Sequence, residues 1–311
     1  MQTVSSIEMD LDFITLRLFC DVVETESFSR AAERNFISQS AVSQRIRSLE
    51  THLGQSLLER RKGQTKIIPT DAGQILYEGA NLILREIVDL ETRLNGLSEE
   101  IAGTVRVATV YSVGLHALPG KLKPFLAAYP QVNVHLEYSQ TLKIYQDVLC
   151  GAIDVGIVAC PAPKNGVQIA PFGEESIALI CAPEHPLASR KEASLSDLED
   201  LPFIGFTADI PTRRLIDDRL QAAGVKVRIV HAFDNIETIK NLVEIGSGVS
   251  LLPEDTVRVE VREGELAMVA LSATSAFKRP VGLLLKQSGA LRPAVKAFCE
   301  AMKLTSGSTD S

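Results

Sequence analysis

Residues 38–53 read Ser-Gln-Ser-Ala-Val-Ser-Gln-Arg-Ile-Arg-Ser-Leu-Glu-Thr-His-Leu, and this stretch decides the fold of the N-terminal part of the chain. Val42, Ile46 and Leu49 recur at helical spacing and predict a single apolar stripe. A second face carries hydroxyls, an amide and a guanidinium, groups that hydrogen-bond to base edges and phosphates. We interpret the stretch as a DNA-recognition helix; an ordinary amphipathic surface helix is the alternative that it leaves open. The second face consists of Ser40, Ser43, Gln44 and Arg47.

The segments before this stretch favour the DNA-binding interpretation. Residues 12–24 predict a first helix with one apolar side. Ser29, followed by small residues and Glu33, predicts the capped start of a short second helix, and Ser38 supplies the cap of the third. Residues 28–53 therefore predict helix, tight turn and helix, the arrangement that sends its second helix into the major groove.

A short basic hairpin is predicted directly after the recognition helix. Leu57 and Leu58 start one strand, Ile67 and Ile68 form the other, and residues 59–66 make a basic turn between them. Such a wing contacts phosphates or the minor groove and adds affinity more than specificity; a solvated charged loop is the alternative. The predicted winged helix-turn-helix domain spans residues 10–69, with its motif at about 28–47. Its predicted DNA-binding residues are Ser38, Gln39, Ser40, Ser43, Gln44, Arg47, Arg60, Arg61 and Lys62.

Residues 70–100 predict one long helix that Asp71 can cap. Apolar side chains follow each other in it at alternating spacings of four and three, which is a heptad seam. Beside a DNA-binding unit, such a seam predicts a linker helix that pairs two protomers; packing onto the protein's own body is the alternative. The seam consists of Leu76, Ala80, Ile83, Ile87, Leu90, Leu94 and Leu97.

Composition and charge narrow the class of protein. An apolar content of 45% without any run of about 18 apolar residues predicts a folded protein with no membrane contact. Met1–Asp12 lacks the basic residues of a secretory signal, and the five cysteines form no C-x-x-C pair, so we expect a cytoplasmic location. Residues 28–66 hold eight basic and three acidic residues, a net +5. Because the whole chain carries −7, the remainder carries −12, and only the N-terminal region suits an anionic partner.

Residues 104–305 alternate strand-like and helix-like segments. This alternation of strands and helices predicts parallel sheets with helices on both faces, and a chain that passes twice between two α/β lobes. We expect lobe I at about residues 104–174 and 275–305 and lobe II at about 175–274, with a ligand cleft between them. The predicted strands lie at 105–110, 132–138, 153–158, 203–206, 227–232, 249–252, 266–271 and 281–285, and the predicted helices at 114–129, 141–150, 212–223, 235–245 and 290–304.

Ligand groups in such a cleft come from the ends of strands and the starts of helices, where this chain offers hydroxyls and an amide. These groups suit a polar or anionic small molecule, although a helix cap without any ligand is the alternative for each. The five histidines are scattered, and we find no metal spacing, nucleophile motif or phosphate-binding loop. We therefore expect neither an enzyme nor a metal or other cofactor. The predicted effector-binding residues are Thr109, Ser112, Ser139, Gln140, Thr207 and Ser247.

Nearly the whole chain resembles the LysR-type transcriptional regulators. The N-terminal resemblance lies in Phe19, Ser29-x-Ala31-Ala32, Ser38-Gln39-Ser40-Ala41-Val42-Ser43, Arg47-x-Leu49-Glu50, Leu53-Gly54, Leu58-x-Arg60 and Thr70-x-Ala72-Gly73. The C-terminal resemblance lies in Leu118-Pro119, Tyr129-Pro130, Gly151-x-Ile153-Asp154-x-Gly156-Ile157, Pro183-x-His185-Pro186-Leu187 and Gly246-x-Gly248-Val249-x-Leu251-Leu252-Pro253. The chain departs from the family at Ser40, where proline is usual, and by starting several residues early.

The resemblance implies an N-terminal all-α winged helix-turn-helix with a long linker helix, followed by an α/β two-lobed effector domain similar to type 2 periplasmic binding proteins. It implies a regulator of transcription that binds double-stranded DNA as a homodimer or homotetramer, meets RNA polymerase, and responds to a small-molecule effector. By family position, Ser112 and Thr207 are the first candidates for effector contact, followed by Gln140. A binding or transport protein of the periplasmic type, and an enzyme built on the α/β body, are the rival interpretations.

Overall fold

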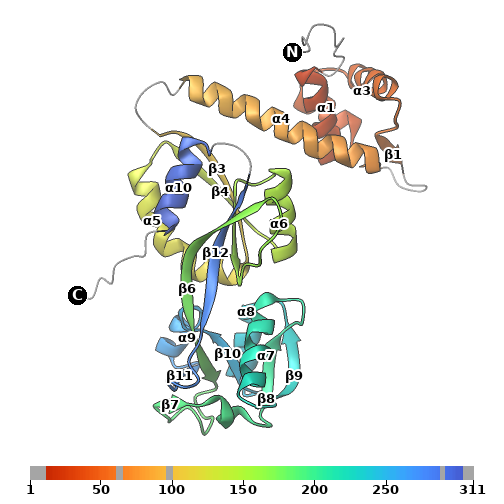
Figure 1. Ribbon diagram of the computed structural model, residues 1–311. Coiled ribbons are helices and arrows are strands. Elements are labelled where there is room, and N and C mark those ends of the chain that lie inside the picture. The colour runs from red at the N-terminus through yellow and green to blue at the C-terminus, as the bar shows by residue number, and fades with distance from the viewer. Residues whose placement is uncertain (1–11, 61–65, 96–100, 288–290, 304–311) are drawn as a thin grey trace. The chain divides into compact units, whose positions relative to one another are not determined.

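The computed structural model describes residues 12–60, 66–95, 101–287 and 291–303, which form two compact units, Met1–Glu99 and Glu100–Ser311. We call the first the DNA-binding unit and the second the effector unit (Figure 1). Across those described ranges, no helix combines the length and the apolar character that a membrane span needs. The elements of the DNA-binding unit are α1 (Phe13–Thr25), α2 (Phe28–Arg34), α3 (Gln39–Leu53), β1 (Leu58–Arg60), β2 (Ile67–Pro69) and α4 (Asp71–Asn95).

The DNA-binding unit folds around the apolar stripe of α3. Val42, Ile46 and Leu49 are at most 2% exposed and pack with Ala31 and Ala32 of α2, whose small side chains let the helices approach closely. The strands β1 and β2 pair antiparallel and form the predicted hairpin after α3. The apolar periodicity of the sequence thus predicts the elements that hold α3 in place.

Two of the predicted helix caps are wrong, and one is confirmed. Ser27 rather than Ser29 is the N-cap of α2, because Ser27 has an extended backbone and its hydroxyl accepts from the Arg30 amide. The Thr70 hydroxyl, not Asp71, accepts from the amide of Gly73 in the first turn of α4, at 3.0 Å. Ser38 caps α3 as predicted, accepting from Ala41 N at 3.2 Å.

The apolar residues of the α4 seam divide between two environments. Leu76 and Ala80 pack against Leu16 and Cys20 of α1, inside the DNA-binding unit. Further along the helix, Ile83 is 45% and Leu90 is 51% exposed. The first part of the seam therefore docks α4 onto its own body, whereas the later part faces outward. The side chain of Leu94, and Leu97 altogether, lie outside the described residues.

The effector unit has two lobes joined by two long strands, β6 (Val167–Cys181) and β12 (Lys278–Lys286), which run side by side from one lobe to the other (Figure 1). Lobe I contains β3 (Gly103–Thr109), η1 (Val113–Ala117, a π-helical turn), α5 (Leu118–Ala128), β4 (Val132–Tyr138), α6 (Thr141–Cys150), β5 (Val155–Ala159) and α10 (Pro293–Lys303). Lobe II contains β7 (Glu192–Ala193), η2 (Leu195–Leu198), β8 (Pro202–Phe206), α7 (Pro211–Ala222), β9 (Arg228–Phe233), α8 (Ile236–Glu244), β10 (Ser250–Pro253), η3 (Glu254–Thr256), α9 (Arg258–Glu263) and β11 (Ala267–Leu271).

Helices cover both faces of the lobe I sheet, as the sequence predicts (Figure 1). Phe125 of α5 and Phe298 of α10 pack edge to face on one side, and Ile144 and Val148 of α6 are buried on the other. Lobe II has its own core, to which β8, β10, β11, α7 and α8 contribute. Each lobe therefore has apolar core clusters of its own.

The predicted parallel pairing is confirmed for the strands that alternate with helices, but the sheets also contain antiparallel strands. The strand β3 pairs parallel with β4 and β5, and β8 pairs parallel with β9, but β12 is antiparallel to both β5 and β6. In lobe II, β10 and β11 are also antiparallel to β6. The sequence did not predict β6, and the expected lobe boundary at residues 174 and 175 falls inside it.

Candidate nucleic-acid interface and ligand pocket

The predicted DNA-reading groups lie together on the outer side of α3. Ser38, Gln39, Ser40, Gln44 and Arg47 are exposed and Ser43 is half-buried, while the stripe on the opposite side of the helix is buried. The first turn of α3 thus presents one amide and several hydroxyls without a carboxylate. This face can donate to and accept from base edges in a major groove.

A hollow of about 440 Å³ lies between α3 and the hairpin, lined in part by Gln39, Arg47 and Glu50. Glu50 does not present its charge freely there, since its carboxylate accepts from the amides of Leu57 and Leu58, at 2.8 and 3.3 Å. The same contacts fix the start of β1 against the recognition helix. Arg60 ends β1, but its side chain, together with Arg61 and Lys62, lies outside the described residues, so their DNA contacts stay predictions.

Part of the basic charge in residues 28–66 is already paired. Arg34 donates to Asp21 and to Glu24, both at 2.7 Å, and these hydrogen bonds raise the pKa of the guanidinium. Lys66 pairs with Glu26 at 2.5 Å. The net charge of the segment therefore overstates the basic surface that it offers to DNA.

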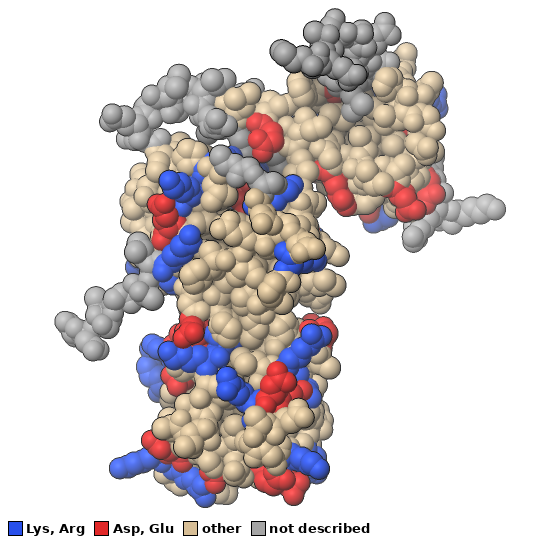
Figure 2. Space-filling view, viewed as in Figure 1, with Lys and Arg blue, Asp and Glu red and all other residues tan. Residues whose placement is uncertain are grey.

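On the face of the effector unit seen in Figure 2, basic and acidic side chains are interspersed.

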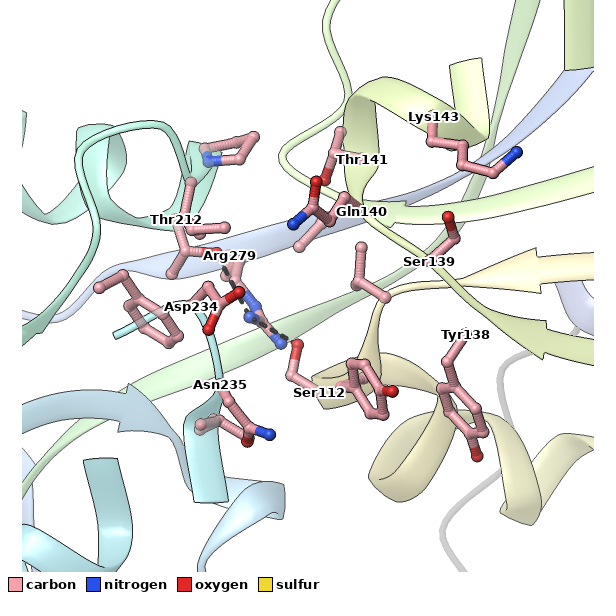
Figure 3. A pocket seen from close by; sticks show the side chains of 17 residues that line it. Ser112, Tyr138, Ser139, Gln140, Thr141, Lys143, Thr212, Asp234, Asn235 and Arg279 are labelled. Carbon is pink, nitrogen blue, oxygen red and sulfur yellow. Dashed lines mark hydrogen bonds between the residues drawn. The ribbon is translucent and has the colours of Figure 1, made fainter. Parts of the chain in front are cut away.

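A pocket of about 410 Å³ lies between the lobes of the effector unit (Figure 3). The helices α6, α7 and α8 all begin at its wall, and Ser112, just before η1, lines it as well. The side chains at the N-caps of α6 and α7, Gln140 and Ile210, make no capping hydrogen bond. First-turn amides without intrahelical partners and the positive ends of helix dipoles favour a bound anion.

Arg279 of β12 forms the buried floor of this pocket. It is 1% exposed, and its Nε and Nη2 atoms lie 2.8 and 2.6 Å from Oε2 of Glu175 on β6. Its Nη1 donates to Ser112 of lobe I at 3.2 Å and to Thr212 of lobe II at 3.3 Å (Figure 3). Arg279 thus connects both lobes, while Glu175 compensates its charge.

The pocket has an aromatic edge next to this polar floor. The rings of Tyr111 and Tyr138 stack with centroids 4.9 Å apart and an interplanar angle of 11°. Both rings line the pocket and stay partly exposed, Tyr111 at 50% and Tyr138 at 38%. The pocket can therefore accommodate a ligand with a polar or anionic end and a flat apolar part.

A second contact joins the lobes beside the pocket. His116 Nε2 of η1 lies 3.1 Å from Oε1 of Glu237 in the first turn of α8. Lys240, whose side chain is 4% exposed, pairs with Glu237 at 2.7 Å and with Glu260 at 2.5 Å. Burial opposes ionisation of Glu260, but the hydrogen bond and charge of Lys240 outweigh it and hold the pKa of Glu260 below its usual value.

Of the predicted effector residues, Ser112, Ser139 and Gln140 line the pocket, and Thr109, Thr207 and Ser247 do not. Thr109 is fully buried with its methyl group against Gly114, because the last residue of β3 faces the lobe interior. Ser247 follows the end of α8, not its start. Several further pocket-lining residues were not predicted from the sequence, among them Tyr111, Tyr138, Thr141, Thr212, Asp234, Asn235 and Arg279.

Within the described ranges, no group of three or more histidine, cysteine or acidic side chains is arranged to hold a metal ion. Burial raises the pKa of Cys181 and of Cys299 to about 11, so these thiols stay protonated at neutral pH.

Comparison with known proteins agrees with both halves of this description. Residues 13–74 match the family described as bacterial regulatory helix-turn-helix protein, lysR family, and residues 98–305 match the LysR substrate binding domain. A probable RuBisCO transcriptional regulator of Cyanidioschyzon merolae is 29% identical over 293 residues, which cover 92% of this chain and 96% of that protein. The HTH-type transcriptional regulator CysL of Bacillus subtilis is 27% identical over 257 residues, 83% of this chain and 85% of CysL.

Among solved structures, full-length CbnR complexed with its target DNA superposes with a TM-score of 0.76 at 24% identity, covering 94% of this chain and 99% of CbnR. This likeness confirms the predicted fold class, a winged helix-turn-helix with a long helix followed by an α/β effector domain. A periplasmic-type transport protein is not favoured, since the helix-turn-helix family covers the N-terminal unit. The chain belongs to the LysR family and is a DNA-binding transcriptional regulator with a C-terminal effector-binding domain.

Proposed function

We propose that the effector is a small organic anion bound between the lobes, and that its binding changes how the regulator acts on promoter DNA. The convergence of the starts of α6, α7 and α8 on the pocket carries this proposal, since helix N-termini stabilise negative charge. Ser112, Ser139, Gln140 and Thr212 supply the polar contacts. We assign no effector contact to three of the predicted residues, Thr109, Thr207 and Ser247, because they do not line the pocket.

The ligand acts through a difference in affinity between conformations. A ligand held by Ser112 of lobe I and Thr212 of lobe II favours the arrangement in which both lobes touch it. If that arrangement binds or bends DNA differently, ligand and DNA affinities are coupled reciprocally. Tight binding alone would shift nothing, so the coupling depends on a lobe arrangement that the ligand prefers.

On the DNA side, the proposed base readers are Gln39 and Arg47, with Ser38, Ser40, Ser43 and Gln44 beside them. The wing residues Arg60, Arg61 and Lys62 are proposed to contact phosphates. The regulator pairs through α4, places one α3 in each half-site, and meets RNA polymerase at the promoter. Working on DNA, it is proposed to be cytoplasmic and to have no catalytic activity or cofactor.

The pocket proposal is tested by thermal shift with a panel of small carboxylates, each matched by its uncharged amide. A carboxylate that binds only the folded state, at a free concentration one hundred times its Kd, stabilises the effector unit by about 2.7 kcal/mol. We expect Thr212→Val to reduce that shift strongly and Thr207→Val, outside the pocket, to leave it intact. Stabilisation by the amides as strong as by the carboxylates would contradict an anionic effector.

A further inference from the structure

Ser29 makes a contact that the fold of the DNA-binding unit does not require. It lies in the first turn of α2, one residue after the helix begins, and its hydroxyl donates to Oε1 of Gln39 at 3.0 Å. Gln39 is the first residue of α3, so the bond connects the starts of the two helices of the helix-turn-helix motif. Both side chains are exposed, which places the bond on the outer surface.

Residues other than Ser29 and Gln39 cap the two helices and fix the turn between them. Ser27 caps α2 and Ser38 caps α3. The turn between them is fixed by Asn35, whose side-chain amide donates to Asp21 at 2.6 Å and to the Ala31 carbonyl at 2.9 Å. An exposed hydrogen bond between two surface side chains adds little to the stability of such a unit. The bond is therefore better explained by what it does to Gln39.

We propose that Ser29 is a positioning residue for DNA recognition, which holds the Gln39 amide in the orientation that reads a base. This inference rests on the proposed role of Gln39 as a base reader. A long glutamine side chain loses much rotamer freedom when it is ordered, and the Ser29 bond orders it before DNA arrives. The DNA-bound conformation is then already present in the free protein.

The direction of the bond also sets what Gln39 presents to DNA. With Oε1 accepting from Ser29, the amide turns its Nε2 hydrogens outward as donors. In the major groove, acceptors occur on guanine at N7 and O6, on adenine at N7 and on thymine at O4, whereas cytosine offers a donor. The Ser29–Gln39 pair thus selects a base that presents an acceptor at the contacted position.

A double-mutant cycle on the full-length protein tests this inference. The probe is a labelled duplex that the unmodified protein enriches from a randomised library, compared with a scrambled duplex of the same composition. We expect Gln39→Ala to reduce the ratio of the two affinities about tenfold and Ser29→Ala about three- to tenfold. The double variant should match Gln39→Ala alone, since Ser29 acts only through Gln39. Ser29→Thr, which keeps the hydroxyl, should restore discrimination.

The controls separate positioning from other roles. Ser56→Ala removes another exposed serine hydroxyl of this unit, which bonds the Leu58 carbonyl, and should leave the ratio unchanged. A library selected with Ser29→Ala should lose base preference at the same position as one selected with Gln39→Ala. Gln39→Glu keeps an acceptor for Ser29 but removes the outward donor, so it should discriminate no better than Gln39→Ala.

The possible contrary results distinguish an error in the role of Ser29 from an error in the role of Gln39 or in its amide orientation. Additive losses in the double variant would mean that Ser29 contacts DNA itself, and would overturn positioning. If Gln39→Ala reduces discrimination while Ser29→Ala does not, positioning fails and the base-reader proposal stands. If Gln39→Ala leaves discrimination intact, both fail. If Gln39→Glu keeps full discrimination, the amide orientation inferred for the pair is wrong.

Discussion

Arg279 and Glu175 form an ion pair whose side chains are both almost fully buried, at 1% and 5% exposure. Removing one partner of such a pair leaves an uncompensated charge in the interior. We expect Arg279→Met to destabilise the effector unit by about 3–5 kcal/mol. The double change Arg279→Met with Glu175→Met should recover much of that loss, since no charge is then left unpaired. Urea unfolding followed by circular dichroism measures the free energy of unfolding of the single and the double variant.

The neighbouring pair on the same two strands provides the control for this prediction. Lys278 and Glu174 lie 3.4 Å apart with both side chains 61% exposed. Solvent screens such a pair, so Lys278→Met should change stability by less than about 1 kcal/mol. Equal effects of Arg279→Met and Lys278→Met would show that burial of the Arg279 pair has no energetic consequence.

The sequence predicted the pocket residues that follow two neighbouring strands. Ser112 comes after β3, and Ser139 and Gln140 come after β4, and these parallel strands end at one edge of a sheet. Arg279 carried a usable signal, because it alternates with Val281 and falls on the buried side of β12. Its partner Glu175 could not be inferred, since it lies 104 residues away on a strand that the sequence did not predict.

The helix α4 contains two glycines, Gly73 and Gly79, whose surroundings differ. A Cβ added at Gly73 would lie 1.9 Å from the Leu57 carbonyl oxygen, which also accepts from the Thr70 amide. Gly73→Ala should therefore force the first turn of α4 away from the hairpin and destabilise the DNA-binding unit by about 1–3 kcal/mol. Gly79 has nothing within 4 Å of its Cβ position. Gly79→Ala should stabilise the helix by about 0.5–1 kcal/mol.

Thermal unfolding of the two variants measures this contrast. Opposite shifts of the DNA-binding unit's transition are expected, although the substitution is chemically the same on one helix. Shifts of the same sign would mean that the close approach of Gly73 to Leu57 does not constrain how α4 begins.

The elements that the sequence predicted correctly are those with a strong local period, such as the stripe of α3 and the alternation in β4. The helix starts are harder, because Ser27 and Ser29 are equally good caps by composition and only the extended backbone of Ser27 decides. The strand β6 was missed because Pro171, Gly173 and the Glu174-Glu175 pair interrupt its apolar pattern. Its pairing with β12 up to Ser176, and with β10 and β11 beyond it, supplies what local propensity lacks.

Among the residues that the structure describes, the core of the DNA-binding unit includes the start of the α4 seam but not its later apolar residues. The docking of Leu76 and Ala80 onto α1 explains the start of the seam but not Ile83 or Leu90, which stay about half exposed. Exposed apolar side chains in a helical row favour pairing with a second copy of the same helix. A dimer would also place two recognition helices on one DNA molecule, which the small reading face of a single α3 requires for a specific site.

Two substitutions on α4 test this assembly. Leu90 and Val88 are similarly exposed, at 51% and 57%, but lie on nearly opposite sides of the helix. Leu90→Glu introduces a charge into the seam and should lower the mass measured by light scattering toward that of one chain, 33.8 kDa. Affinity for a two-half-site operator should fall with it, while a single half-site is bound as before. Val88→Glu should leave both mass and affinity unchanged. If Leu90→Glu keeps the mass of the unmodified protein, the protomers pair through another surface, and α4 serves only to carry the DNA-binding unit.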